Sequence, residues 1–155
     1  MQKEPEKKYF VLEYVGPAFE RSFNLGDEIQ SIAASRLLPR VDGYISRESL
    51  DTATQRGIIP LNGYFLESDR WPPAPGLTPV FFSFHLAPRA EKIVCSPQGV
   101  AYLKEHEPIG CRDPGTVEIL RSYGVSANYS GCLTLTFERR RKEITDGKVF
   151  LVDLI

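Results

Sequence analysis

The stretch that decides the fold is a short aromatic and β-branched run followed by a turn, Tyr9-Phe10-Val11-Leu12-Glu13-Tyr14-Val15 and then Asn24-Leu25-Gly26-Asp27. Runs of this composition favour a strand. After the turn, apolar residues recur at helical spacing from Glu28 to Leu38, with Asp27 as the expected N-cap and Pro39 as the stop. Strand, glycine-containing turn and helix in this order predict the opening of a βαβ unit.

The alternation of strands and helices continues along the chain. We expect strands at residues 57–63, 79–85, 108–111 and 125–129, and helices at residues 100–106 and 114–123. The pair Asn62-Gly63 is expected to end its strand in a turn, and the proline-rich residues 70–76 are expected to form a surface loop. The pattern predicts an α/β fold, a single Rossmann-like domain with a mostly parallel sheet.

The signals at the ends of the helix expected at 114–123 agree with one another. Asp113 is the expected N-cap, Pro114 suits the first helical position, and Gly124 suits a left-handed C-terminal residue. Residues 133–137 form an apolar run of ambiguous type, and residues 148–155 are expected to form a last strand.

Composition restricts the function classes. The chain has 155 residues, of which 42% are hydrophobic, and a net charge of −1. We expect one domain, residues 9–155, behind a charged and mobile N-terminus, residues 1–8. The absence of a basic excess argues against a nucleic-acid partner. No apolar run of 18 residues and no secretion signal occurs, so we expect no membrane span and a cytoplasmic location.

The cysteines argue against a disulfide framework and against a metal site. Cys95, Cys111 and Cys132 are odd in number and have no Cys-x-x-Cys spacing. The chain has two histidines, and neither lies near a cysteine at ligand spacing. We therefore expect reduced thiols and no metal.

Residues that follow strands are the candidates for a ligand site, because ligands of open α/β sheets bind beyond the carboxyl ends of the strands. The candidate binding residues are Asn24, Gly26, Asp27, Asn62, Gly63, Ser130 and Gly131. Gly26 and Gly131 would let the backbone approach a ligand, and free helix N–H groups favour an anion. No dinucleotide fingerprint is present, so neither NAD nor another cofactor is expected.

Two candidates for catalysis carry more specific chemistry. Arg112 lies between a strand and a helix start, where a guanidinium could clamp a carboxylate or phosphate at two points. The alternative for Arg112 is an ion pair with Asp113 or with another acid at the end of the sheet. His85 is a candidate for proton transfer, with a packing role as the alternative, and the sequence assigns it no acidic partner. Tyr64 and Trp71 either stack on a sugar ring or cover the core.

Three segments resemble conserved motifs of the bacterial polysaccharide pyruvyl transferases. Their opening motif is similar to Asn24-Leu25-Gly26-Asp27-Glu28-Ile29-Gln30-Ser31-Ile32-Ala33. A second motif is similar to Ile109-Gly110-Cys111-Arg112-Asp113-Pro114-Gly115-Thr116. A third, found in one branch, is similar to Tyr129-Ser130-Gly131-Cys132-Leu133-Thr134-Leu135-Thr136. The segments occur in the family's order, and the resemblance spans about residues 9 to 155.

The resemblance implies half of a GT-B-like architecture, in which two Rossmann-like domains face each other across a cleft. It implies transfer of an enolpyruvyl-derived group from phosphoenolpyruvate to hydroxyls of a sugar or glycan acceptor, as in exopolysaccharide biosynthesis. Phosphoenolpyruvate is the donor substrate, Arg112 matches the family's cleft arginine, and the family's histidine would lie beyond Ile155. Asn24, Asp27, Asn62 and His85 are expected to line the cleft.

The family continues into a second domain after the segment that ends this sequence. We expect either a fragment or a one-domain relative, with a partner chain or a second copy supplying the missing half. Two alternatives to an enzyme remain open. One is a non-catalytic module that binds a carbohydrate or an anionic metabolite, and the other is a structural partner that associates through an exposed strand edge.

Overall fold

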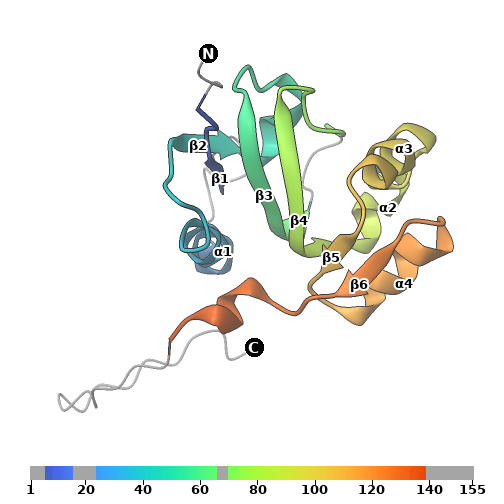
Figure 1. Ribbon diagram of the computed structural model, residues 1–155. Coiled ribbons are helices and arrows are strands. Elements are labelled where there is room, and N and C mark those ends of the chain that lie inside the picture. The colour runs from blue at the N-terminus through green and yellow to red at the C-terminus, as the bar shows by residue number, and fades with distance from the viewer. Residues whose placement is uncertain (1–5, 16–23, 66–69, 139–155) are drawn as a thin grey trace.

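The structure is a computed structural model that describes residues 6–15, 24–65 and 70–138 (Figure 1). Its strands are β1 (Phe10–Glu13), β2 (Gly43–Ser46), β3 (Gly57–Phe65), β4 (Leu77–Leu86), β5 (Ile109–Cys111) and β6 (Ala127–Tyr129). Its α-helices are α1 (Leu25–Ser35), α2 (Glu91–Val94), α3 (Pro97–Glu105) and α4 (Pro114–Ser122). Short 3-10 helices occur at η1 (Arg47–Thr52), η2 (Pro88–Ala90) and η3 (Leu133–Thr136).

The strands of the described residues pair in parallel throughout. β1 pairs with β2, and the other four form a sheet in the order β3-β4-β5-β6. A single bridge between Tyr9 and Ile58 joins the start of β1 to the start of β3. The spatial order is therefore β2-β1-β3-β4-β5-β6, and the prediction of an α/β fold with a parallel sheet is confirmed.

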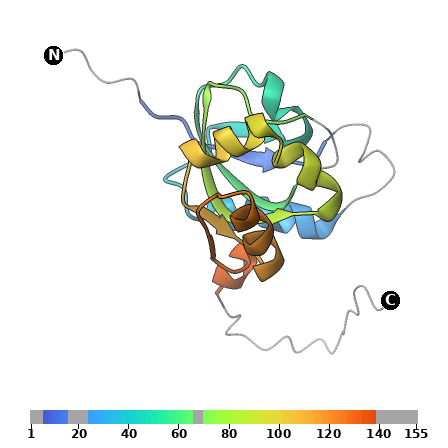
Figure 2. The same ribbon diagram turned by 90° about the vertical axis from the view of Figure 1, so that its right-hand side faces the viewer.

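Helices cover both faces of the sheet. Figure 1 shows α1 on one side of β3 and β4, and α2, α3 and α4 on the other side, which faces the viewer in Figure 2. The larger core lies between the strands and the second group of helices and includes Leu103 of α3 and Leu120 of α4. A smaller cluster lies under α1 and joins Val11, Ala33, Ala34 and Leu133. This layering is consistent with a Rossmann-like domain.

The proline-rich segment 70–76 is a loop, as expected, but its tryptophan packs on the core. The Trp71 ring lies 5.9 Å from the Phe65 ring and 5.5 Å from the Tyr102 ring, centroid to centroid, both nearly edge-on. Burying so large an apolar surface stabilises the fold more than exposing it in a loop would. The Trp71 ring packs against other aromatic rings, and it therefore offers no free face to a sugar ring.

Helix α1 begins earlier than the sequence pattern suggested. Its N-cap is Asn24, whose Oδ1 accepts a hydrogen bond from the Gly26 amide at 2.9 Å. The prediction that Asp27 caps the helix is wrong. Asp27 lies inside the first turn, where an ion pair with a distant arginine holds its carboxylate. Asparagine and aspartate are both good caps, so the local sequence did not separate them.

The pair Asn62-Gly63 does not form the turn that was expected. Both residues lie inside β3, which continues to Phe65, and the pairing with β4 shifts register between Leu61 and Gly63. Gly63 has φ +76°, a conformation that glycine adopts without strain. The register shift falls at this glycine, inside the ladder. Pairing with β4 therefore keeps Asn62 and Gly63 in the strand, although their local sequence favours a turn.

The helix after β5 matches its prediction in detail. Asp113 is the N-cap and accepts from the Thr116 amide, Pro114 opens α4, and Gly124 follows its end with φ +73°. The sequence did not indicate β2 or the short helix α2. The ambiguous residues 133–137 fold largely as η3. The strand expected at 148–155 lies outside the described residues.

Candidate functional site

The candidate site lies where β1 and β3 separate. Their only bridge among the described residues is at their amino ends, between Tyr9 and Ile58, and the strand order reverses direction at this point. Open α/β sheets bind ligands at such switch points, beyond the carboxyl ends of the strands. Helix α1 and η3 contact each other at this end of the sheet, below it in Figure 1.

Side-chain hydrogen bonds fix α1 to both of the separating strands. Ser31 Oγ donates to the Leu12 carbonyl of β1 at 2.6 Å. Asn62 Nδ2 of β3 donates to the Gln30 carbonyl at 3.0 Å. Consecutive residues of the helix therefore hold the two strands. The start of α1 is fixed over the switch point.

A cleft with a volume of about 440 Å³ opens at this position. Its walls come from α1, the end of β3, the residue after β5, and η3. The lining residues are Asn24, Gly26, Asp27, Ile29, Gln30, Tyr64, Arg112 and Thr134. Segments separated by more than a hundred positions in the sequence meet here, because the carboxyl ends of parallel strands share one edge of the sheet.

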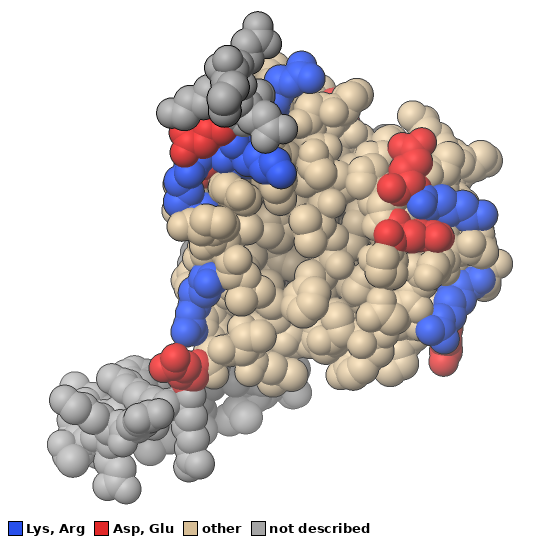
Figure 3. Space-filling model, in the orientation of Figure 1, with Lys and Arg blue, Asp and Glu red and all other residues tan. Residues whose placement is uncertain are grey.

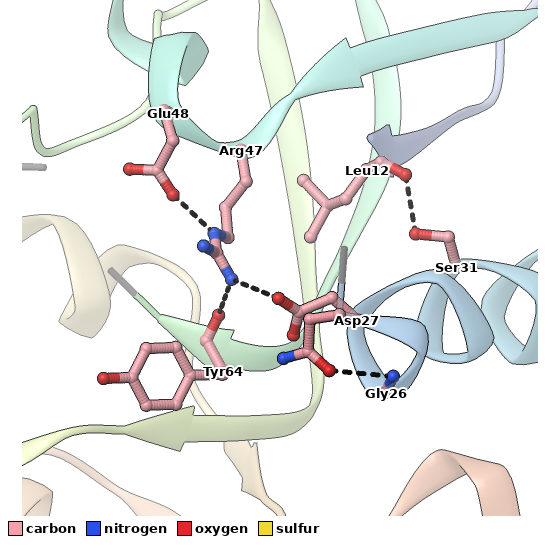
Figure 4. A network of polar contacts seen from close by, with 8 residues as sticks. Leu12, Gly26, Asp27, Ser31, Arg47, Glu48 and Tyr64 are labelled. Atoms are coloured by element: carbon pink, nitrogen blue, oxygen red, sulfur yellow. Dashed lines mark hydrogen bonds and ion pairs between the residues drawn. The ribbon is translucent and has the colours of Figure 1, made fainter. Parts of the chain in front are cut away.

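A buried arginine connects two walls of the cleft. Arg47 is 1% exposed, and its guanidinium lies 3.6 Å from an Asp27 carboxylate oxygen and 2.6 Å from a Glu48 carboxylate oxygen (Figure 4). Its Nη1 also donates to the Tyr64 carbonyl at 2.9 Å. The group faces the ring of Tyr14, with 5.0 Å from Cζ to the ring centroid. The buried guanidinium of Arg47 therefore compensates the negative charge of Asp27 at the start of the helix.

Arg112 lines the cleft from the opposite side. Its backbone amide donates to the Phe84 carbonyl at 2.8 Å, which fixes the residue at the end of β4 and β5. Among the described residues, its side chain has no hydrogen-bond or ion-pair partner. The ion pair with Asp113 considered from the sequence does not form, because Asp113 bonds a histidine. Within the described ranges, the guanidinium of Arg112 thus lines the cleft unpaired.

His85 and Asp113 form a hydrogen-bonded pair at the ends of β4 and β5. His85 Nδ1 and Asp113 Oδ2 are 2.6 Å apart. Asp113 also accepts from the Thr116 amide and from Thr116 Oγ1, both at 2.9 Å. Burial acts to raise the pKa of Asp113, but these three hydrogen bonds outweigh it and lower the pKa. The ionised carboxylate thus orients the imidazole, and the sequence alone had not assigned His85 this partner.

The histidine is next to the cleft but does not line it. Its ring lies 5.6 Å from the ring of Tyr64, centroid to centroid, and Tyr64 is a lining residue. The guanidinium of Arg89 covers the ring of Tyr64 at 5.5 Å. Tyr64 therefore joins the histidine pair to the lining of the cleft, and its ring already lies against the guanidinium of Arg89.

Two predicted binding residues, Asn62 and Gly63, lie beneath the cleft. Asn62 is fully buried, and a Cβ on Gly63 would meet Cγ of Gln30 at 3.1 Å. They hold Gln30 in place and do not line the cleft. Asn62 Oδ1 and Gln30 Oε1 are both buried and have no hydrogen-bond partner among the described residues.

The two remaining candidates, Ser130 and Gly131, shape the loop that enters η3. Ser130 Oγ accepts from the Ser83 amide at 3.0 Å and donates to the Cys111 carbonyl at 3.1 Å. Gly131 has φ +75°. Neither lines the cleft, and the Ser130 hydroxyl already has two partners. Ser83 Oγ in turn accepts from the Leu133 amide at 2.9 Å, which fixes η3 against the end of β4.

Four features of the site were not singled out from the sequence: Asp113 as the partner of the histidine, the buried Arg47, and the lining residues Gln30 and Thr134. Gln30 had a usable signal, since it lies one turn after Gly26 on the same helix face. Arg47 had none, because it precedes no motif and Asp27, the partner that connects it to α1, lies 20 positions away.

Charge and metal chemistry give no further site in the described residues. On the face drawn in Figure 3, Lys, Arg, Asp and Glu lie along the margins and leave the centre uncharged. No group of three His, Cys, Asp or Glu residues there could hold a metal ion. No helix in the described ranges is long and apolar enough to cross a membrane.

A hollow of about 820 Å³ lies at the opposite edge of the sheet, beside Lys8, Arg56 and Gly57.

Comparisons with known proteins found no similar chain. No family model, no curated protein and no solved structure matches this sequence or its fold.

Proposed function

We propose that the cleft binds phosphoenolpyruvate and serves a polysaccharide pyruvyl transferase reaction on a sugar acceptor. Two hydroxyls of the sugar form bonds to C2 of the enolpyruvyl group, and the bond between C2 and the phosphate oxygen breaks. One hydroxyl proton goes to C3, which becomes a methyl group, and the other leaves with inorganic phosphate. The product is a cyclic pyruvate ketal.

The observation that carries the proposal is the guanidinium of Arg112, which has no partner among the described residues and lines a cleft at a helix start. A guanidinium binds a carboxylate or phosphate through two parallel hydrogen bonds. The start of α1 borders the same space, where the helix dipole adds positive potential that acts against the acidic side chains of Asp27 and Glu28 in the first turn. Phosphoenolpyruvate carries both kinds of anionic group, so Arg112 would take one and the start of α1 would face the other.

The convergence of three segments supports the specific reaction. The opening motif supplies Asn24, Gly26 and Gln30, the second supplies Arg112, and the third supplies Thr134. These are the segments in which the sequence resembles the polysaccharide pyruvyl transferases.

His85 would accept the proton of the attacking hydroxyl. Asp113 holds Nδ1 of the imidazole, which orients the ring and would stabilise it once protonated, as an acid partner does for a catalytic histidine. The His85 side chain is 23% exposed, so a hydroxyl can reach the imidazole ring. In a GT-B-like arrangement this edge of the sheet would face a second Rossmann-like domain, and a partner chain or a second copy could provide it.

The test is binding followed by turnover, both with the 155-residue chain. Phosphoenolpyruvate is titrated by calorimetry against the wild type, Arg112→Ala and the control Arg56→Ala, whose arginine lies at the other edge of the sheet. We expect binding to the wild type and to Arg56→Ala, and a loss of about tenfold or more in affinity for Arg112→Ala, from a charge-assisted bidentate contact.

Phosphate release is then followed with galactose- and mannosamine-containing acceptors. His85→Gln is expected to lower acceptor-dependent release by about 100-fold or more, the usual contribution of a general base. The matched control is His106→Gln, because His106 bonds the Tyr102 carbonyl on α3 and lies away from the cleft lining. Absence of phosphoenolpyruvate binding by the folded wild type would overturn the proposal. Binding without turnover in all acceptors would instead favour a non-catalytic binding module.

A further inference from the structure

Strand β4 contains one residue more than its pairing with β3 requires. The pair Leu61–Phe81 is followed by the pair Gly63–Phe84, so the chain advances two positions on β3 and three on β4. The burial of the side chains shows the same irregularity, because Phe81 and Phe84 both lie in the larger core. A regular strand would turn them to opposite faces of the sheet. Residues 82–83 therefore form a β-bulge.

Ser83 adopts a left-handed backbone conformation in this bulge, with φ +59°. In the part of the chain that the structure describes, it is the only residue other than glycine with a positive φ. A residue with a Cβ is strained in this conformation, which persists only where the surrounding structure holds it. Such residues concentrate at functional sites, and Ser83 precedes His85 by two positions.

The two polar groups of Ser83 hold the loop that leads into η3. Ser83 is fully buried, and its backbone amide donates to Ser130 Oγ at 3.0 Å. Its own Oγ accepts from the Leu133 amide at 2.9 Å. The next residue, Thr134, lines the cleft. One residue of β4 therefore holds both ends of the segment 130–133 and fixes the wall that η3 forms.

The same bulge lies against the end of β5, which carries Arg112. The Arg112 amide donates to the carbonyl of Phe84, the residue that directly follows the bulge. Gly110 of β5 packs closely on the bulge, since a Cβ there would meet the Phe81 carbonyl oxygen at 3.0 Å and Phe82 Cα at 3.4 Å. This close approach of two backbones favours a residue without a side chain. The bulge thus adjoins both η3 and the backbone of Arg112.

We propose that Ser83 is a positioning residue of the cleft, whose bulge sets the distance between Thr134 of η3 and Arg112 at the end of β5. The inference rests on the proposed function, because phosphoenolpyruvate is the ligand whose affinity reports this distance. Ser83 is not among the lining residues, and it acts through its hydrogen bonds to Ser130 and Leu133. Removing its hydroxyl should displace η3 while the guanidinium of Arg112 stays in place.

Two substitutions separate the hydroxyl of Ser83 from its backbone strain. Ser83→Ala removes the hydroxyl and retains the strain, whereas Ser83→Gly removes the hydroxyl and relieves the strain, because glycine adopts a positive φ freely. The urea midpoint should therefore be lower for Ser83→Ala. Calorimetric titration should nevertheless show the same loss of phosphoenolpyruvate affinity in both variants, about tenfold, which is within the loss that a misplacement of about 1 Å can cause.

The control is a serine with the same kind of hydrogen bond away from the cleft. Ser96 Oγ accepts from the Gly99 amide at 3.2 Å and caps α3, which packs on the opposite face of the sheet from α1. Ser96→Ala should lower the urea midpoint, as the loss of a helix cap does, and leave the affinity for phosphoenolpyruvate at the wild-type value.

Hydrogen exchange of the 155-residue chain tests the positioning without any ligand. In both Ser83 variants the Leu133 amide loses its acceptor, and amides in the segment 130–137 should exchange about tenfold faster than in the wild type, the effect of one lost buried hydrogen bond. The amides of α4 should keep their wild-type rates, which shows that the sheet and its helices remain formed. Ser96→Ala should leave the segment 130–137 unchanged.

Two results would overturn this inference. One is wild-type exchange of the segment 130–137 in both Ser83 variants. The other is an affinity that follows the urea midpoint across Ser83→Ala, Ser83→Gly and Ser96→Ala, because Ser83 would then contribute to stability alone. If the folded wild type bound no phosphoenolpyruvate, the proposed function would fail, and the exchange of the segment 130–137 would still decide whether Ser83 positions η3.

Discussion

The buried guanidinium of Arg47 lies 3.6 Å from the carboxylate of Asp27, and this ion pair joins η1 to the first turn of α1. The same guanidinium donates to the Tyr64 carbonyl at the end of β3. One cation thus holds the helix start and the strand end that form two walls of the cleft. It also neutralises an acid at a position where an anionic ligand is expected.

Replacing Arg47 with methionine should destabilise the fold strongly. Asp27 and Glu48 would keep their charge but lose the guanidinium, and removing one partner of a buried ion pair costs about 3–5 kcal/mol. Urea denaturation of Arg47→Met, compared with the wild type, measures the loss. The control is Arg40→Met, whose ion pairs with Glu6 and Asp42 are exposed, and its unfolding should change little. Equal unfolding midpoints for the two variants would contradict the structural role of Arg47.

Removing the cap of α1 should loosen the helix start. Asn24→Ala takes away the oxygen that accepts from the Gly26 amide, and the loss of an N-cap costs about 0.5–2 kcal/mol. Asn24→Ser should recover most of the stability, because serine is also a good cap. Hydrogen exchange of the first amides of α1 reports the local effect. If Asp27→Ala accelerated this exchange through loss of a cap and Asn24→Ala did not, the cap would be wrongly placed.

Gly63 and Gly131 have the same backbone conformation but different surroundings. Alanine substitutions at the two positions therefore distinguish the cost of backbone strain from the cost of side-chain crowding. Gly63 and Gly131 have φ +76° and φ +75°, so alanine at either position should cost about 1–2 kcal/mol for the left-handed conformation. At Gly63 the added Cβ would also meet Gln30 Cγ at 3.1 Å, whereas at Gly131 its nearest contact is the Tyr129 hydroxyl at 3.8 Å. Chemical denaturation should therefore show a larger loss for Gly63→Ala. A larger loss for Gly131→Ala would contradict the packing of Gln30 on β3.

The Asp113 carboxylate should make stability fall in acid. Its pKa is lower in the folded chain than the ordinary value of about 4, so its contribution is fully present above that value and is lost as the pH falls through the lower folded pKa. Asp113→Asn keeps an N-cap for α4 but has no titrating group. Urea midpoints measured from neutral pH down to about pH 3 should decline less steeply for Asp113→Asn than for the wild type. Parallel declines would contradict the lowered pKa.

Much of the fold was predictable because its signals are local. The apolar runs at β1, β3, β4 and β5 carry the composition of buried strands, and α4 has its cap, its proline and its terminal glycine within a dozen residues. The strand β2 was missed because Gly43 and Ser46 flank only two apolar residues. Pairing with β1 stabilises it as a strand, and this contact is not visible in a four-residue segment.

The candidate site was predictable in its segments and not in its contacts. Asn24, Gly26, Asp27 and Arg112 line the cleft, as expected from their places after strands. Asn62 and Gly63 come at the same edge of the sheet but lie beneath Gln30, because β3 continues past them. The rule that ligands bind beyond the carboxyl ends of parallel strands locates this edge of the sheet. It does not tell which side chains reach the surface there.

The sequence by itself determined the parallel α/β layering, the start of α4 at its capping residue, and the set of strand ends from which a site can be built, because hydrophobic periodicity and capping act over a few neighbouring residues. Only the tertiary structure decided that Asp113 pairs with His85, that Arg47 compensates Asp27, and that Arg112 faces the cleft without a partner among the described residues. The two contacts join side chains 20 and 28 positions apart, and they form because strand order and register place distant residues within a few ångströms of each other.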